Sequence, residues 1–309
     1  MIVRPRPHWF SMLFIWRGSV LKKLLPRLLI VFLIGLGAVL FHGYFERTQI
    51  LDLNPQPFTL LGLALAIFLG FRTNVSYDRY WEARKLWGSV LNYARALARQ
   101  ALTITAWTPD TPEARRFVLG LAATAHALRH QLRDTDASAD LQRLLQLPEA
   151  DLAKIKTARF PPILIVRLLA EQLHAARRQG QLSDTLALAM EKNLDGYSDS
   201  IGGCERILTT PVPLTFSLMV HRTVYFYCSL LPFALAASIG WLTPVFAAFV
   251  AYAFMALEAI AEELEQPFGA DPNDLPLQAM SQTIEASLLE MLGDVPPPAA
   301  PVPQNYVVL

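Results

Sequence analysis

Three long stretches of this 309-residue chain contain no Asp, Glu, Lys or Arg, and they limit its fold more than any other feature. They cover residues 28–45, 53–71 and 223–257. A helix needs about 20 apolar residues to cross the hydrocarbon core of a bilayer, so the first two stretches are each long enough for one crossing. The third is long enough for two, and Gly240, Trp241 and Pro244 at its centre predict a turn at the membrane surface. The sequence therefore predicts an all-α membrane protein with four transmembrane helices.

The cations beside these stretches predict the orientation. Before the first stretch the chain carries six cations and no acid, namely Arg4, Arg6, Arg17, Lys22, Lys23 and Arg27. The link between the first two stretches has one cation, Arg47, beside Glu46 and Asp52. Because cytoplasmic loops carry an excess of Lys and Arg, we expect both termini and the middle of the chain in the cytoplasm. No small-residue cleavage site follows the first stretch, so we interpret it as a retained helix and not a signal peptide.

Most of the charges lie between the second and third stretches. Apolar residues recur there at helical spacing, as in Leu86, Val90, Ala94, Leu97 and Ala101. The prolines of the last residues prevent helix formation and favour a flexible tail. The predicted organisation is a cytoplasmic N-terminal segment, two transmembrane helices, a cytoplasmic helical domain, two further transmembrane helices, an acidic loop with a cytoplasmic helix, and a Pro-rich tail. The corresponding ranges are 1–27, 28–81, 82–210, 211–262, 263–293 and 294–309.

Charge and motifs exclude several classes of function. The net charge of +1 predicts no nucleic-acid partner, and the basic N-terminus is explained by topology and by lipid headgroups. No serine lies in a Gly-x-Ser-x-Gly motif. His126 and His130 have the i, i+4 spacing of a metal pair, but Ala127 stands where a zinc protease has its glutamate. We therefore predict that the chain is not an enzyme.

The second apolar stretch carries a pattern of large side chains. Leu63, Ile67 and Phe71 recur every fourth residue and share one helix face, beside small residues that permit close helix contact. One interpretation is a packing face or a face toward lipid. If several copies surround an axis, the same face forms a ring of large apolar side chains, and such a constriction gates ions by dewetting. The pattern alone is compatible with both.

The sequence that follows this pattern resembles the bestrophin family. Arg79-Tyr80-Trp81 is similar to an Arg-Trp-Trp-like sequence that follows the pore neck in that family. Two later segments also resemble bacterial bestrophins and occur in the same order. These are Gly203-Cys204-Glu205-Arg206 with Pro211, Pro213 and His221-Arg222-Thr223-Val224-Tyr225, and the Pro-Phe-Gly acidic loop within residues 265–274. The resemblance covers nearly the whole chain.

This resemblance implies a homopentamer around a central pore in a bacterial inner membrane. The pore neck would be Leu63, Ile67 and Phe71, and a cytoplasmic constriction would lie within residues 182–186, at Thr185. Chloride-selective members have more aromatic side chains at the neck, whereas this chain has only Phe71. We therefore expect a channel for small monovalent ions that favours cations over chloride. Its partners would be its own copies, membrane lipid and the permeant ions.

The resemblance also implies a possible calcium site. The side-chain ligands would be Glu263, Gln266, Asp271 and Asp274, which all present the oxygen donors that calcium needs. Alternatively, Asp271 and Asp274 cap a helix that starts near Leu275. No other cofactor is expected. The alternative function is a membrane scaffold or regulatory protein that conducts no ions.

Overall fold

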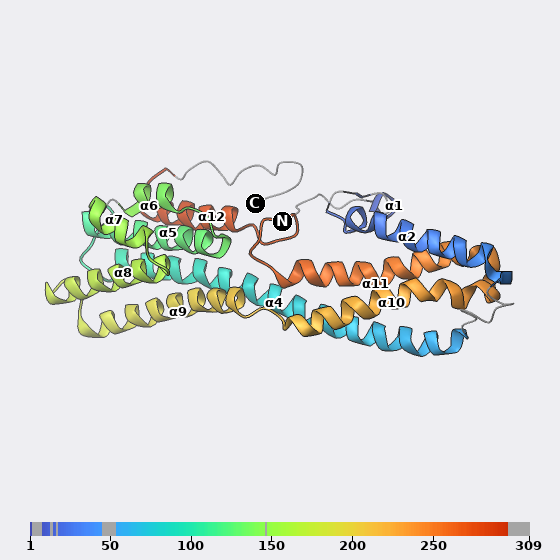
Figure 1. The fold of residues 1–309 in the computed structure, drawn as a ribbon. Coiled ribbons are helices and arrows are strands. Elements are labelled where there is room, and N and C mark those ends of the chain that lie inside the picture. The colour runs from blue at the N-terminus through green and yellow to red at the C-terminus, as the bar shows by residue number, and fades with distance from the viewer. Residues whose placement is uncertain (2–7, 13–14, 17, 45–53, 146, 296–309) are drawn as a thin grey trace. The chain divides into compact units, whose positions relative to one another are not determined.

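All regular secondary structure in the described part of the chain is helical (Figure 1). The computed structural model describes residues 1, 8–12, 15–16, 18–44, 54–145 and 147–295. The helices are α1 (Trp9–Met12), α2 (Leu21–Leu40), α4 (Pro55–Thr103), α5 (Pro112–Arg133), α6 (Ser138–Leu145), α7 (Glu149–Lys156), α8 (Pro161–Arg178), α9 (Asp184–Thr209), α10 (Leu214–Ile239), the 3-10 turn η1 (Gly240–Leu242), α11 (Thr243–Glu265) and α12 (Leu277–Met291). The prediction of an all-α protein is confirmed. The predicted link around Arg47 and the Pro-rich residues 296–309 lie outside the described residues.

The chain divides into two compact units. The apolar unit comprises Pro5–Tyr80 and Pro211–Gln266. The charged unit comprises Met1–Arg4, Trp81–Thr210 and Pro267–Leu309. Helix α4 belongs to both units, and no break interrupts it between Pro55 and Thr103.

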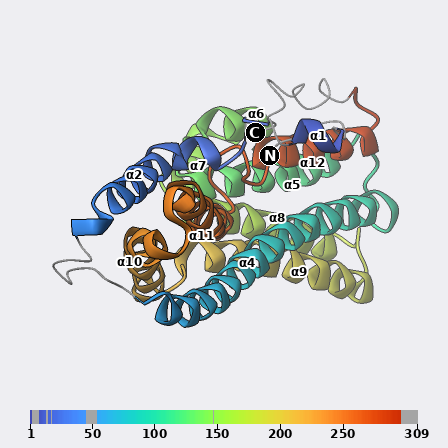
Figure 2. The same cartoon turned by 90° about the vertical axis from the view of Figure 1, so that its right-hand side faces the viewer.

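The apolar unit contains α2, the first half of α4, α10 and α11. Three described segments are long and apolar enough to cross a membrane: Leu21–Leu40, Pro55–Thr103, and Leu214–Glu265, which contains α10 and α11. Helices α2, α10 and α11 pack side by side, as Figure 2 shows. Gly35 permits part of this contact, because a Cβ atom there would lie 2.8 Å from the Cα of Pro244.

The predicted turn in the third apolar stretch is present. Helix α10 ends at Ile239, and Gly240 adopts a φ of +51°, which few side chains tolerate. The turn η1 follows, and Pro244 lies in the first turn of α11, where it needs no hydrogen-bond donor. Gly240, Trp241 and Pro244 therefore separate two antiparallel apolar helices.

In the charged unit, α5 is the central helix. It contacts α6, α8, α9 and α12, and its buried side chains include Phe117, Leu121 and Leu128. Tyr197 of α9 donates a hydrogen bond of 3.0 Å to the carbonyl oxygen of Leu121. The stripe predicted in the second half of α4 is part of the core. Its four fully buried members are Val90, Ala94, Leu97 and Ala101.

Candidate functional site

The predicted pore-neck residues share an exposed face of α4. The side chains of Leu63, Ile67 and Phe71 are 62%, 51% and 62% exposed in a single chain. The opposite face of the same helix is buried at Leu65 and Leu69. Large apolar side chains that one chain leaves exposed mark a surface that lipid or another protein covers. The geometry is thus compatible with a ring of copies, and the neck assignment stays a prediction.

The small residues beside this face have different surroundings. Gly62 faces α10, where a Cβ atom would lie 2.7 Å from the hydroxyl oxygen of Tyr227. Gly70 has no atom within 4 Å of such a Cβ position, and Ala66 is exposed. Of the two glycines, Gly62 is the one at which an added Cβ atom would meet a side chain of a neighbouring helix.

The Arg79-Tyr80-Trp81 motif contains a helix-capping arginine. Nε of Arg79 donates a hydrogen bond of 2.8 Å to the carbonyl oxygen of Glu265, the last residue of α11. The last carbonyl groups of a helix have no partner within it, and they carry the negative end of its dipole. A guanidinium group therefore stabilises this end of α11.

A buried ion cluster lies beside the exposed face of α4. Arg72 is 5% exposed, and its terminal nitrogens lie 3.8 Å from Oε1 of Glu258 and 3.6 Å from Oε2 of Glu265. Nδ1 of His221 lies 2.6 Å from the same Oε1 of Glu258. The sequence analysis missed this cluster. Arg72 and Glu258 each directly follow an uncharged stretch, and this position in the sequence indicates the end of the stretch but not the pairing.

Thr185 lies in the first turn of α9 and is exposed. Its neighbour Asp184 accepts a hydrogen bond of 2.6 Å from Nε of Arg177. Leu182, just before the helix, is buried. Thr185 is exposed in a single chain, and its role as a constriction stays a prediction.

The four predicted calcium ligands are divided between the two units. Glu263 lies in the apolar unit and pairs with Lys23 at 2.8 Å, and Gln266 is in the same unit. Asp271 and Asp274 are in the charged unit. Calcium takes about six to eight oxygen ligands. Among the described residues, no three His, Cys, Asp or Glu side chains are grouped so that they could hold a metal ion.

The side chains of Asp274 and of Arg133 on α5 hydrogen-bond the backbone of the acidic loop. Oδ2 of Asp274 accepts a hydrogen bond of 2.8 Å from the backbone N–H of Asp271, and burial raises the pKa of Asp274. The guanidinium of Arg133 donates to the carbonyl oxygens of Phe268 and Leu275 at 3.2 Å and 3.1 Å. Asp274 and the loop carbonyl oxygens of Phe268 and Leu275 thus already have hydrogen-bond partners, and calcium binding stays a prediction.

The alternative of helix capping by Asp271 or Asp274 is wrong. Helix α12 begins at Leu277, and its N-cap residue is Pro276, which has no side-chain cap. The carboxylate of Asp274 instead accepts a hydrogen bond from the backbone N–H of Asp271, within the loop.

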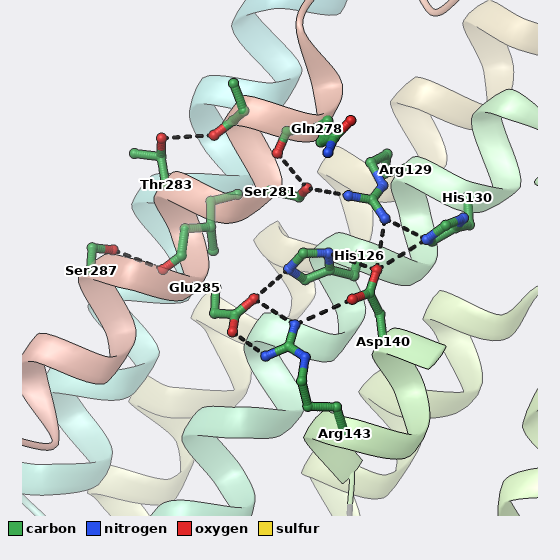
Figure 3. Close-up of polar contacts among 12 residues, drawn as sticks. His126, Arg129, His130, Asp140, Arg143, Gln278, Ser281, Thr283, Glu285 and Ser287 are labelled. Atoms are coloured by element: carbon green, nitrogen blue, oxygen red, sulfur yellow. Dashed lines mark hydrogen bonds and ion pairs between the residues drawn. The ribbon is translucent and has the colours of Figure 1, made fainter. Parts of the chain in front are cut away.

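The candidate metal pair His126 and His130 belongs to an ionic network instead. Figure 3 shows His126 of α5 between Glu285 of α12 and Asp140 of α6. Its Nε2 lies 2.8 Å from Oε2 of Glu285, and its Nδ1 lies 3.3 Å from Oδ2 of Asp140. Arg143 also binds Glu285, and Arg129 binds Asp140 at 2.7 Å.

The two histidines of this network have opposite pKa shifts. Burial alone lowers the pKa of His126, but its contacts with Asp140 and Glu285 outweigh burial and raise it. Burial lowers the pKa of His130. Both ring nitrogens of His126 face carboxylates of this network, and the described residues contain no group of three His, Cys, Asp or Glu side chains that could hold a metal ion.

Comparison with known proteins identifies the family. The family model described as Bacterial/Fungal Bestrophin protein matches residues 1–290. The chain belongs to the bacterial and fungal bestrophin family. This bestrophin is similar to a voltage-dependent anion channel-forming protein of Ralstonia nicotianae, with 50% identity over 294 residues, 95% of each chain. It is also similar to the voltage-dependent anion channel-forming protein YneE of Escherichia coli K12, with 40% identity over the full length of both.

Solved structures of bacterial bestrophins share this fold. A bacterial bestrophin homologue from Klebsiella pneumoniae aligns with a TM-score of 0.84 and 44% identity, over 88% of this chain and 100% of that chain. The bestrophin resemblance predicted from the motifs is therefore confirmed. Membership of a channel family also agrees with the prediction that the chain is not an enzyme.

Proposed function

We propose that the chain forms a homopentameric ion channel in the bacterial inner membrane. Four transmembrane helices would be α2, the first half of α4, α10 and α11, with both termini in the cytoplasm. The observation that carries the proposal is the exposed face of Leu63, Ile67 and Phe71 on α4. Five copies of this face around an axis make an apolar neck, and relatives named as channel-forming proteins support this interpretation.

The proposed mechanism is partial dehydration at the neck. An ion that passes the ring loses water to a wall with no charge, and a narrow apolar wall dewets when it closes. The ring therefore acts as a gate and discriminates weakly between ions. Thr185 is our candidate for a second constriction, at which its hydroxyl group would contact a passing ion.

We propose that the channel prefers monovalent cations to anions. The neck has one aromatic ring, at Phe71, and Asp78 is exposed seven residues further along α4. Seven residues are about two helical turns, so Asp78 and Phe71 share a face. A ring of carboxylates beside an uncharged neck attracts cations. The names of the relatives favour the opposite sign, and anion conduction is therefore the second candidate.

A reversal-potential measurement tests this function. Purified protein in a planar bilayer with a KCl gradient should give currents whose reversal potential is shifted from zero toward the potassium equilibrium potential. Reversal near the chloride potential would establish the anion channel. Absence of current together with a monomeric or dimeric protein would favour the non-conducting scaffold.

A further inference from the structure

A pocket in the apolar unit has no role in the proposed conduction. Its volume is about 270 Å³, and it lies among α2, α4, α10 and α11. Its polar lining consists of Arg27, Arg72, Ser217, His221, Glu258 and Glu262.

The pocket lies where the apolar stretches end. Arg27 directly precedes the stretch 28–45, Arg72 directly follows 53–71, and Glu258 directly follows 223–257. If these stretches cross the membrane, as proposed above, the pocket is at the depth of the lipid headgroups. The inference rests on that membrane placement and not on conduction.

Two buried donors in the pocket lack a partner. The carboxylates beside Arg72 are 3.6 Å and 3.8 Å from its terminal nitrogens, which is longer than a hydrogen bond. Nε of Arg72 and the hydroxyl of Ser217 have no hydrogen-bond partner among the described residues. A buried polar group without a partner costs free energy, so an acceptor oxygen in the pocket would stabilise both donors.

The charges of the pocket select the kind of ligand. Arg27 and Arg72 balance Glu258 and Glu262, so a ligand with both signs and no net charge fits better than a simple anion. Arg27 is held by a hydrogen bond of 2.6 Å from its Nη1 to the hydroxyl of Tyr225. Glu262 is exposed at the rim and has no ion pair among the described residues.

We propose that this pocket binds the phosphoethanolamine headgroup of a phospholipid. The phosphate accepts hydrogen bonds from Ser217 and Nε of Arg72 and lies near Arg27, and the ammonium donates to Glu262. A primary ammonium donates hydrogen bonds to a carboxylate, whereas a quaternary choline has no N–H to donate. The pocket therefore prefers ethanolamine to choline and glycerol headgroups.

Native mass spectrometry of the purified full-length protein tests this binding. The protein is mixed with phosphatidylethanolamine, phosphatidylcholine or phosphatidylglycerol of the same acyl chains. Ser217→Ala and Glu262→Gln should each weaken retention of phosphatidylethanolamine about fivefold, as expected for one lost hydrogen bond. Lys22→Gln is the matched control, because it removes an exposed cation from α2 and does not line the pocket. An unchanged oligomeric state shows that each variant is folded.

The possible results distinguish a membrane phospholipid from a soluble ligand with the same chemical groups. Binding of free phosphoethanolamine with the same variant pattern supports the site chemistry with a soluble ligand. Binding of inorganic phosphate that ignores Glu262→Gln would overturn the zwitterionic assignment. Equal retention of the three lipids, or no effect of either variant, would overturn the site itself. Lipid retention without ion currents would overturn only the proposed channel.

Discussion

Phe71 and Arg72 are adjacent on α4 and have opposite environments, because Phe71 is exposed and Arg72 is buried against Glu258 and Glu265. The helix therefore presents an apolar face on one side and an ion cluster on the other. A change in the charges of the cluster would act on the same turn of α4 that carries the proposed neck.

The apolar face of α4 leads to a prediction about the current after the proposed neck is widened. Replacing Leu63, Ile67 and Phe71 together with alanine should raise single-channel conductance or open probability several-fold, because a wider neck holds water more easily. The measurement is current in planar bilayers. Phe68→Ala is the control, since it removes a ring from the adjacent face of α4. Unchanged currents in the triple variant would show that the gate is elsewhere.

The position of Asp78 leads to a prediction about the selectivity between cations and anions. Asp78→Asn should reduce the ratio of cation to anion permeability, because it removes five carboxylates beside the proposed neck. The ratio follows from the reversal potential in a KCl gradient. Asp110→Asn, in the loop between α4 and α5, should leave the ratio unchanged. If Asp78→Asn behaved like this control, the charge that sets the sign would lie elsewhere.

The ion cluster predicts a stability effect. Arg72→Met removes the cation beside Glu258 and Glu265 and leaves Glu258 with His221 as its partner. We expect a loss of about 3 kcal/mol, the low end of the range for a broken buried ion pair, because the contacts of Arg72 are longer than hydrogen bonds. Adding Glu258→Gln to Arg72→Met should recover part of this loss. Thermal unfolding in detergent measures both variants. Equal midpoints for the single variant and the unchanged protein would argue against the cluster.

His126 predicts a pH dependence in the charged unit. Its pKa is raised in the folded protein by Asp140 and Glu285. The resulting stabilisation is complete below the ordinary histidine pKa of about 6.5 and is lost as the pH rises through the raised value. Amide hydrogen exchange in α12 should therefore accelerate relative to its intrinsic rate above neutral pH.

The charged residues around His126 also affect how the stability of the charged unit depends on pH. The hydrogen bonds of His126 and Arg143 to Glu285 outweigh burial and lower the pKa of Glu285 to about 2, so its contribution to stability is lost as the pH falls from the ordinary carboxyl pKa toward that value. The hydrogen bond to Glu285 raises the pKa of Arg143, so Arg143 stays charged, and burial lowers the pKa of His130. His126→Gln should remove the loss of stability above neutral pH, whereas His130→Gln should retain it. A pH profile unchanged by His126→Gln would refute the assignment.

The hydrogen bonds of the acidic loop lead us to expect that calcium affects neither the currents nor the stability of the protein. Arg133 occupies two loop carbonyl oxygens, and Asp274 bonds the loop backbone. A calcium chelator should therefore leave both currents and the unfolding midpoint unchanged. A fall in the midpoint that added calcium reverses would establish the predicted site at Asp271 and Asp274.

The sequence predicts the apolar unit well, because an uncharged stretch of membrane length has few alternatives to a helix. It also predicts the turn at Gly240 and the buried stripe from Val90 to Ala101, since both depend on local pattern. The ion clusters depend on distant residues and could not be paired in advance. Glu285 lies 159 residues from His126, and charges such as Arg72 that follow an apolar stretch indicate only its end. The proposed neck would require neighbouring copies, so the structure of a single chain does not test it.

The exposed face of α4 has a consequence for assembly. While a newly inserted chain is alone, Leu63, Ile67 and Phe71 can rest against acyl chains. In a ring they would move from hydrocarbon to a water-filled passage, and this transfer is unfavourable for apolar surface. In the proposed pentamer, contacts between subunits at other surfaces would therefore have to supply the free energy that joins the copies. A dry, closed neck would be the resting form of such a ring, and opening would require work.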